Sequence, residues 1–265
     1  MKIIDIHSVA EYVDIACKSN NEMENDTILF RGQPDKENQL LPSLGRKSAD
    51  GKALLCEEKS MIEMAKYKLP TVFRRDLEPI ELLALLQHHG IPTRLLDVSA
   101  NALVGLYFAC HGNAESEERD GEVILFKSSE IDISKYNLVN RVCDTYKIGR
   151  EFEQSELEFL HQNSERPFFV YAPSYSLRQN IQSGRYILFS NKVVKENDTF
   201  KMVDEIAPVS KEREAIVCRI IVPSDVKEEI RKDLRLLGIS KELLFLDNAD
   251  MVCREIRDRF SERRH

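Results

Sequence analysis

The stretch from residue 87 to residue 111 reads QHHGIPTRLLDVSANALVGLYFACH and governs the interpretation of the whole chain. A helix should precede it, because Glu78-Pro79 places proline near a first helical position and Gly90 supplies a glycine after the last turn. Residues 92–97 read as a short extended segment, and residues 101–111 are apolar enough for a buried helix. The stretch therefore predicts helix, extended segment and helix, with polar residues gathered at the turns.

Outward from this stretch, strands are expected where β-branched and aromatic residues form short runs, and helices where apolar residues recur at helical spacing. The expected strands are residues 27–30, 122–126, 167–172, 185–190 and 215–222. The expected helices are a short one after Ser8 and residues 52–68, 78–88, 101–111, 152–161, 224–237 and 248–260.

Helices dominate the first half of the chain and strands cluster after residue 120, without strict alternation. This order favours an α+β fold over a doubly wound parallel sheet. We expect a single domain over residues 1–265, with a helix-rich N-terminal half and a central mixed or antiparallel sheet. The helical segment at about residues 46–90 should pack on the sheet core.

Composition narrows the classes of function. The 265 residues are 42% hydrophobic and carry a net charge of −7, which argues against non-specific binding to a nucleic-acid backbone. Six cysteines occur without a CxxC pair, which suits free thiols in a reducing compartment. No apolar run resembles a signal peptide or a membrane span, so we expect a cytoplasmic protein without membrane contact.

A first candidate site is Phe30-Arg31-Gly32-Gln33, at the end of an expected strand. The guanidinium of Arg31 presents a planar fork of donors suited to phosphate or carboxylate. Gly32 would let a ligand approach the backbone. The alternative is an arginine paired with a structural carboxylate before an ordinary turn.

A second candidate site collects His88, Thr93, Arg94, Asp97 and Ser99 before the apolar helix. Helix capping explains one or two of these polar residues but not all of them. His88 is either a general acid/base, since its usual pKa lies near neutrality, or a hydrogen-bonded core histidine. Arg94 and Asp97 either contact a ligand or pair with each other.

A third candidate site is the polar stretch of residues 178–186, which leads into a strand. Gln182 carries donors and an acceptor that suit ribose hydroxyls or an amide, or the loop's own backbone. The sequence contains no GxxxxGK[ST], GxGxxG or HExxH motif. P-loop phosphate chemistry and zinc hydrolysis therefore have no support, and no metal is expected.

Together these motifs resemble the FRG-domain family, which is named for a Phe/Tyr-Arg-Gly motif. The resemblance covers nearly the whole chain, and its most specific part is the block from Thr93 to Asp97. Three departures from the family pattern are Val98-Ser99, His89 and Tyr186. The matching stretches are Phe30-Arg31-Gly32-Gln33, Leu41-Pro42-Ser43, Gln87-His88-x-Gly90-x-Pro92-Thr93-Arg94-Leu95-Leu96-Asp97, Leu106-Tyr107-Phe108-Ala109 and Arg178-x-x-x-Gln182-x-Gly184.

The resemblance implies a bacterial or phage protein, in some cases linked to antiphage defence. The order of its motifs is similar to that of ADP-ribosyltransferases, which implies NAD as the cofactor and a nucleic acid or protein as the target. In that reading Arg31 holds the diphosphate, Thr93 or Ser99 orients the nicotinamide ribose, and Gln182 bonds its 2′-hydroxyl. The implied catalytic residues are Arg31, His88, Asp97, Ser99 and Gln182. The implied cofactor-binding residues are Phe30, Arg31, Gly32, Gln33, Thr93, Arg94, Tyr107 and Arg178.

Gln182 stands where a transferase has a glutamate, and an amide cannot act as a carboxylate base. Asp97, Glu122, Glu151 and Glu153 are the candidates to replace it.

Two other functions remain open at this point. One is a non-catalytic nucleotide or nucleic-acid sensor built on Arg31, Arg94, Arg178 and Arg185. The other is a hydrolase that uses His88 with Asp97 and Ser99. The sequence leaves the target and the oligomeric state open.

Overall fold

The structure is a computed structural model that describes residues 2–23, 27–47, 54–128, 137–145, 152–164, 167–172 and 177–245. The helix expected at residues 248–260 lies outside the described residues, as does Glu151. All statements below concern the described parts of the chain.

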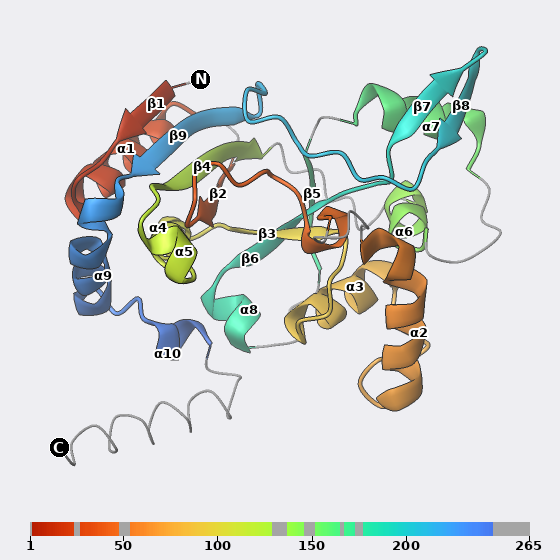
Figure 1. The fold of residues 1–265 in the computed structure, drawn as a ribbon, viewed down its shortest axis with the longest axis horizontal. Helices are drawn as coiled ribbons and strands as arrows, with labels where there is room; N and C mark the ends of the chain where they lie inside the picture. The colour runs from red at the N-terminus through yellow and green to blue at the C-terminus, as the bar shows by residue number, and fades with distance from the viewer. Residues whose placement is uncertain are drawn as a thin grey trace.

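The described strands form a mixed sheet in the order β1-β9-β4-β2-β3-β6-β5, which confirms the α+β prediction (Figure 1). β1 runs parallel to β9, and the other neighbours are antiparallel. A separate hairpin joins β7 (Val193–Glu196) to β8 (Thr199–Met202). The strands of the sheet are β1 (Lys2–Asp5), β2 (Thr27–Gln33), β3 (Leu95–Ser99), β4 (Gly121–Ser128), β5 (Phe168–Val170), β6 (Gly184–Leu188) and β9 (Ile216–Val222).

Helices cover the sheet in two groups. In Figure 1, α1, α4 and α9 lie beside the β1–β9–β4–β2 half, and α2, α3 and α6 lie toward the β3–β6–β5 half. The α-helices are α1 (Val9–Asn21), α2 (Glu58–Lys68), α3 (Pro79–His88), α4 (Ala102–Cys110), α5 (Ala114–Glu117), α6 (Asn137–Cys143), α7 (Gln154–Gln162), α8 (Leu177–Ile181), α9 (Lys227–Leu236) and α10 (Lys241–Leu244). Short 3-10 turns occur at Ser43–Gly45, Leu54–Glu57 and Ser224–Val226.

Local sequence signals set several of these ends. The hydroxyl of Ser8 accepts from the Glu11 backbone N–H at 3.2 Å, and the Glu11 carboxylate accepts from the His7 backbone N–H at 2.7 Å. The first bond satisfies a donor that the first turn of α1 leaves open, and the second ties the residue before the N-cap to that turn. Helix α3 begins with a capping box and a proline, and Gly90 follows it with a φ of +80°. The predicted ends of α3 are therefore confirmed.

Two parts of the hydrophobic core follow the two groups of helices, and a third part spans both halves of the sheet. One buried cluster joins α1, α4 and α9 to β2, β4 and β9. A second joins α2, α3, α6 and α7 to β3, β5 and β6, which is where the helices expected at residues 46–90 pack. A third cluster contains side chains that alternate along the strands with those of the first two clusters, such as Leu29, Val98 and Ile187. It also includes the segment around Leu40 and Leu44.

The two halves of the sheet meet at a narrow connection, which we call the β2–β3 joint. β2 pairs with β4 along its whole length, from Thr27 to Gln33, and β3 pairs with β6 along all of its residues. Between β2 and β3, the described ladder contains the single pair Phe30↔Ser99. Beyond that pair the strands are not joined by the ladder, so side chains can enter between them.

Gly32 is needed where helix α4 crosses β2. A Cβ at this position would lie 1.9 Å from the carbonyl oxygen of Gly105 and 2.7 Å from the backbone nitrogen of Ala109. Real carbon atoms do not approach backbone atoms so closely, so α4 can pack here only on a glycine. The structure shows that Gly32 admits a helix, and the expectation that it also admits a ligand to the backbone stays a prediction, since Gly32 lines the pocket described below.

Several expected elements differ in detail. The helix expected from residue 224 begins as a 3-10 turn and becomes α9 only at Lys227, and the one expected from residue 52 has a 3-10 turn before α2. Outside the named strands, one isolated bridge joins Leu40 to Val209 in the described residues. β1, the β7–β8 hairpin and α8 were not expected. No helix in the described ranges is both long and apolar enough to cross a membrane.

Candidate functional site

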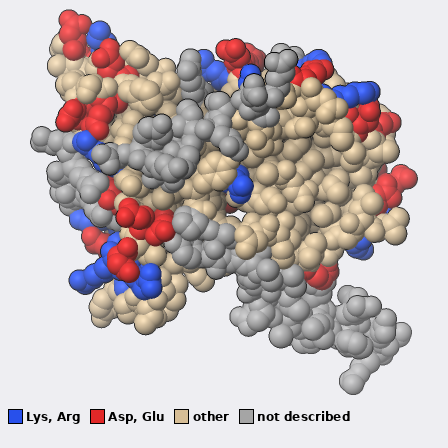
Figure 2. Space-filling view, turned by 180° about the vertical axis from the view of Figure 1, so that it is seen from behind, with Lys and Arg blue, Asp and Glu red and all other residues tan. Residues whose placement is uncertain are grey.

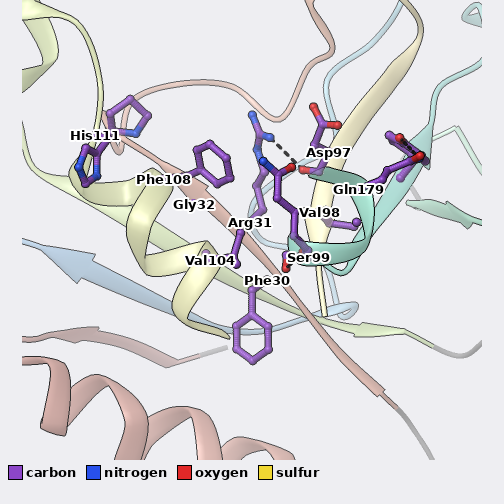
Figure 3. A pocket seen from close by; sticks show the side chains of 15 residues that line it. Phe30, Arg31, Gly32, Asp97, Val98, Ser99, Val104, Phe108, His111 and Gln179 are labelled. Atoms are coloured by element: carbon purple, nitrogen blue, oxygen red, sulfur yellow. Dashed lines mark hydrogen bonds between the residues drawn. The ribbon is translucent and has the colours of Figure 1, made fainter. Parts of the chain in front are cut away.

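A pocket of about 200 Å³ lies at the β2–β3 joint (Figure 3). Strands β2, β3 and β6 supply part of its wall, and α4, α8 and the residues that follow them supply the rest. Its lining brings together residues from all three candidate sites, among them Arg31, Asp97 and Gln182. The other lining residues are Phe30, Gly32, Pro34, Val98, Ser99, Val104, Gly105, Phe108, His111, Gln179, Gly184 and Tyr186.

Arg31 is half-buried in the pocket and has unused donors. Its Nη1 donates to the backbone carbonyl of Asp97 at 2.9 Å, which bridges the open part of the joint (Figure 3). Its Nε is buried without a hydrogen-bond partner, and no carboxylate among the described residues lies within ion-pair distance of it. Burial lowers the pKa of Arg31 from its usual value, the charge of Asp97 raises it, and that of Arg46 lowers it. A buried donor without a partner is costly, so this guanidinium is suited to receive an anion.

Asp97 supplies the one carboxylate among the described lining residues. Its Oδ2 accepts from Gln87 Nε2 at 2.9 Å. Figure 3 shows its carboxylate pointing away from the core, on the far side of the Arg31 guanidinium from Phe108. The side chain is exposed, so it can meet a ligand in the mouth of the pocket.

The Ser99 hydroxyl uses its hydrogen bonds to connect backbone segments in the wall of the pocket. It donates to the backbone carbonyl of Gln182 at 2.5 Å and accepts from the Asn101 backbone N–H at 2.9 Å. The Gln182 amide in turn donates to the Leu244 carbonyl at 3.0 Å, which leaves its Oε1 as the free polar atom. The hydroxyl proton of Ser99 is thus directed at a carbonyl, and His88 is not among the lining residues. This geometry does not support the hydrolase alternative.

His111 lines the pocket and was not singled out from the sequence. Its Nδ1 donates to the Tyr107 carbonyl at 2.8 Å, and its ring stacks on the Tyr107 ring with centroids 3.8 Å apart. This bond fixes the tautomer, so in the neutral ring Nε2 is an acceptor. Burial lowers the pKa of His111, the bond to Tyr107 raises it, and the charge of Arg231 lowers it. The imidazole is therefore biased toward the neutral form.

Gln179, Tyr186 and Phe108 are further lining residues that the sequence did not single out. The Gln179 amide donates to the Tyr186 hydroxyl at 2.5 Å, which fixes both side chains on the β6 side of the pocket. Phe108 lies on α4, and Figure 3 shows its ring beside the Arg31 side chain. Gln179 lies within the polar stretch 178–186, so its position in sequence was a usable signal, whereas nothing local distinguishes Phe108.

Arg94 lies outside the pocket, in the core. Its side chain is 1% exposed and makes a bidentate ion pair with Glu58, from Nε to Oε1 at 2.8 Å and from Nη2 to Oε2 at 2.5 Å. Its Nη1 donates to Asn191 Oδ1 at 3.1 Å and to the Phe189 carbonyl at 3.3 Å. Arg94 therefore links α2 to the end of β6, and it does not pair with Asp97.

Gln33 also lies outside the pocket. Its amide donates to the Asn38 carbonyl at 3.0 Å and to Glu122 at 3.1 Å. Glu122 is fully buried and is held by Lys211 and by two bonds from Arg219, at 2.9 and 2.8 Å. Glu122 is therefore not available as a catalytic carboxylate.

Other predicted site residues do not line the pocket either. Thr93 is buried and bonded to Gln87. His88 lies at the end of α3 with its ring edge against that of His89, at 5.1 Å between centroids. Tyr107 is buried behind His111.

The arginine cluster of the sensor alternative is not assembled around this pocket. Arg185 places its guanidinium over the Tyr171 ring, 4.4 Å from the centroid, and Arg94 is in the core. Arg178 belongs to α8, and its side chain lies outside the described residues. Glu153, a candidate carboxylate, caps α7 away from the pocket.

Comparison with known proteins identifies a domain family over part of the chain. The family model of the FRG domain matches residues 26–118. No curated protein and no solved structure matches the chain. The matched segment runs from just before β2 to α5 and contains Arg31, Thr93 and Asp97, whereas Gln182 lies beyond it. The resemblance of the motifs to the FRG family is thereby confirmed over residues 26–118, where the family model matches.

Proposed function

We propose that the pocket at the β2–β3 joint binds NAD and that the protein is an ADP-ribosyltransferase-like enzyme. The observation that carries this proposal is that a guanidinium with unused donors and the one carboxylate among the described lining residues belong to the same pocket. NAD presents a diphosphate and ribose hydroxyls close together, which are the partners that Arg31 and Asp97 suit.

The size of the pocket limits which part of NAD it holds. Pockets that enclose drug-sized ligands occupy about 300–1,000 Å³. A volume of about 200 Å³ suits one end of a dinucleotide, such as the nicotinamide ribose, with the adjoining diphosphate at Arg31. The adenosine end would then extend beyond the lining residues.

The chemistry requires a carboxylate that Gln182 does not supply, and we assign this role to Asp97, the one carboxylate among the described lining residues. In the transfer, the bond between nicotinamide and ribose C1′ breaks, and nicotinamide leaves with the bonding electron pair. Asp97 would stabilise the positive charge that develops on the ribose, while Gln182 Oε1 accepts a bond from a ribose hydroxyl. The acceptor then bonds to C1′ and gives up its proton, either to Asp97 or to His111 Nε2.

The acceptor is proposed to be a nucleic acid or a protein, as expected for a toxin or an antiphage effector. Figure 2 shows the face opposite to that of Figure 1, where the basic side chains drawn are scattered among acidic ones around the edge. This face offers no continuous basic surface among the described residues, so a nucleic-acid acceptor would have to meet the protein elsewhere.

The test is release of nicotinamide and transfer of label from labelled NAD, in the presence of DNA, RNA or cell lysate. Arg31→Met should weaken NAD binding roughly 10- to 100-fold, because a charged hydrogen-bond partner is lost. Asp97→Asn should lower turnover by about 100-fold or more. Arg74→Met, which changes an exposed arginine away from the pocket lining, is the matched control. If no mixture shows nicotinamide release or label transfer, the proposed enzymatic activity is refuted.

The second candidate function is a non-catalytic nucleotide sensor. It is favoured by Gln182, because an amide binds ribose without promoting bond cleavage. A sensor would bind NAD or another nucleotide through Arg31 without releasing nicotinamide, and its affinity would fall steeply with salt. Turnover that depends on Asp97 would exclude it.

A further inference from the structure

We propose that Gln87 and Thr93 are positioning residues that hold the Asp97 carboxylate in place as an acceptor for the substrate. Neither residue lines the pocket. This inference rests on the proposed function for the role of Asp97, but the chain of hydrogen bonds behind it can be tested without any substrate.

The chain of bonds has a fixed direction. The Leu95 backbone N–H donates to Thr93 Oγ1 at 3.1 Å, so the Thr93 hydroxyl must direct its own proton elsewhere. That proton goes to Gln87 Oε1 at 2.7 Å. With its oxygen engaged by Thr93, the amide of Gln87 can present only its NH₂ group to Asp97 Oδ2, at 2.9 Å.

The result is a carboxylate with one oxygen occupied and the other available. The second Gln87 N–H is also used, since Nε2 lies 3.3 Å from the Leu95 carbonyl. Arg31 holds the backbone of the same residue through the Asp97 carbonyl. Asp97 is thus restrained at both its main chain and its side chain, and no hydrogen bond from the described residues occupies Oδ1. A preorganised acceptor of this kind loses little freedom when a substrate binds.

The backbone between the two positioning residues explains why the chain of bonds can close. Helix α3 ends at His88, and Gly90 reverses the chain with a φ of +80°. The Gly90 N–H donates to the Gln87 carbonyl at 3.0 Å, which ties the turn to the helix. This turn returns β3 alongside the last residues of α3, so Thr93 and Asp97 both reach Gln87.

Three substitutions separate positioning from simple structural support. Gln87→Glu removes the donor and sets a second carboxyl beside Asp97, so turnover should fall roughly 10- to 100-fold. Thr93→Val removes the hydroxyl that orients the amide and should act in the same direction. Thr93→Ser keeps the hydroxyl and should recover most of what Thr93→Val loses. The Arg74→Met control should not change turnover.

A double-mutant cycle then asks whether Gln87 acts through Asp97. In an Asp97→Ala background, Gln87→Glu should have no further effect on turnover, because the group it positions is gone. If the effects of Gln87→Glu and Asp97→Ala multiply instead, Gln87 does not act through Asp97 and the inference is overturned.

A measurement without substrate separates this inference from the proposed function. The side-chain NH₂ resonances of Gln87, assigned by their loss in Gln87→Glu, should shift in Asp97→Ala and in Thr93→Val but not in Arg74→Met. Unchanged resonances in Asp97→Ala would overturn the inference even if the enzyme turns over NAD. Shifted resonances in a protein that releases no nicotinamide would retain the positioning role and reject the proposed enzyme.

Discussion

Replacing Gly32 with alanine should be among the most damaging small changes to this protein. The added Cβ would lie 1.9 Å from the Gly105 carbonyl oxygen, whereas ordinary contacts of a Cβ begin at 3.4 Å. Helix α4 would therefore have to move locally by about 1.5 Å, the difference between these distances. The obstructing atoms belong to backbone rather than to a flexible side chain, so no rotamer change relieves the clash.

The magnitude follows from the cost of overpacking. Forcing one extra carbon into a packed core typically costs about 1–3 kcal/mol. We expect the upper end of that range or more, because α4 carries buried residues such as Leu106 and Ala109 that must move with it. The free energy of unfolding of a whole domain is about 5–15 kcal/mol, so the loss should be easy to measure.

The assay is urea unfolding followed by circular dichroism, with Gly184→Ala as the matched control. A Cβ at Gly184 would meet its nearest neighbour at 3.5 Å, an ordinary contact, so alanine there should be neutral or slightly stabilising. A Gly32→Ala protein whose free energy of unfolding lies within about 0.5 kcal/mol of the parent would refute the reasoning, because such a change is typical of an unconstrained surface site.

Three further outcomes are expected. Arg94→Met should lower the free energy of unfolding by about 3–5 kcal/mol in the same urea assay, because the buried carboxylate of Glu58 would be left without an opposite charge. A loss below about 1 kcal/mol would contradict the ion pair. Alkylation of the native protein at pH 8 should label the exposed thiols Cys17 and Cys56 and spare Cys110, whose pKa burial raises to about 12; equal labelling, read by mass spectrometry, would show that Cys110 is accessible. The pKa of His111 in the folded state is lowered mainly by burial, so protonation favours the unfolded state and stability should decline as pH falls below about 6.5. A His111→Gln protein should show less of this decline. Identical pH profiles of the melting temperatures of the two proteins would contradict this prediction.

Local patterns were sufficient for the elements that carry their own signals. Helix α3 has a capping proline at one end and Gly90 at the other, and β9 is a dense run of β-branched residues. Both were predicted to within two residues. The run of Ile, Leu and Phe before Arg31 also identified β2, although the strand continues to Gln33 and does not end at Phe30 as expected.

Elements that depend on distant partners were missed. β1 is a short edge strand with exposed residues, and it is a strand only because β9, near the other end of the chain, lies beside it. The β7–β8 hairpin had a signal that was not used. Its turn residues Asn197 and Asp198 adopt positive φ angles, which these residue types tolerate better than most.

The candidate site shows the same division. Polar residues at the ends of strands indicated Arg31 and Asp97, and both line the pocket. The neighbouring arginine Arg94 has an equally polar context but is neutralised by Glu58, on a helix 36 residues earlier. His111 was missed because its access to the pocket depends on how α4 sits on Gly32, which no pattern near residue 111 encodes.

The described ladder joins the two halves of the sheet through Phe30 and Ser99, so we expect their relative twisting to be resisted least by backbone hydrogen bonds at this joint. An occupant that contacts Arg31 on one side and Asp97 on the other would stiffen this joint without moving any strand. Occupancy would then change the fluctuations of distant edges of the sheet, at β1 and at β5, and a partner bound at either edge could sense the filled state through rigidity alone.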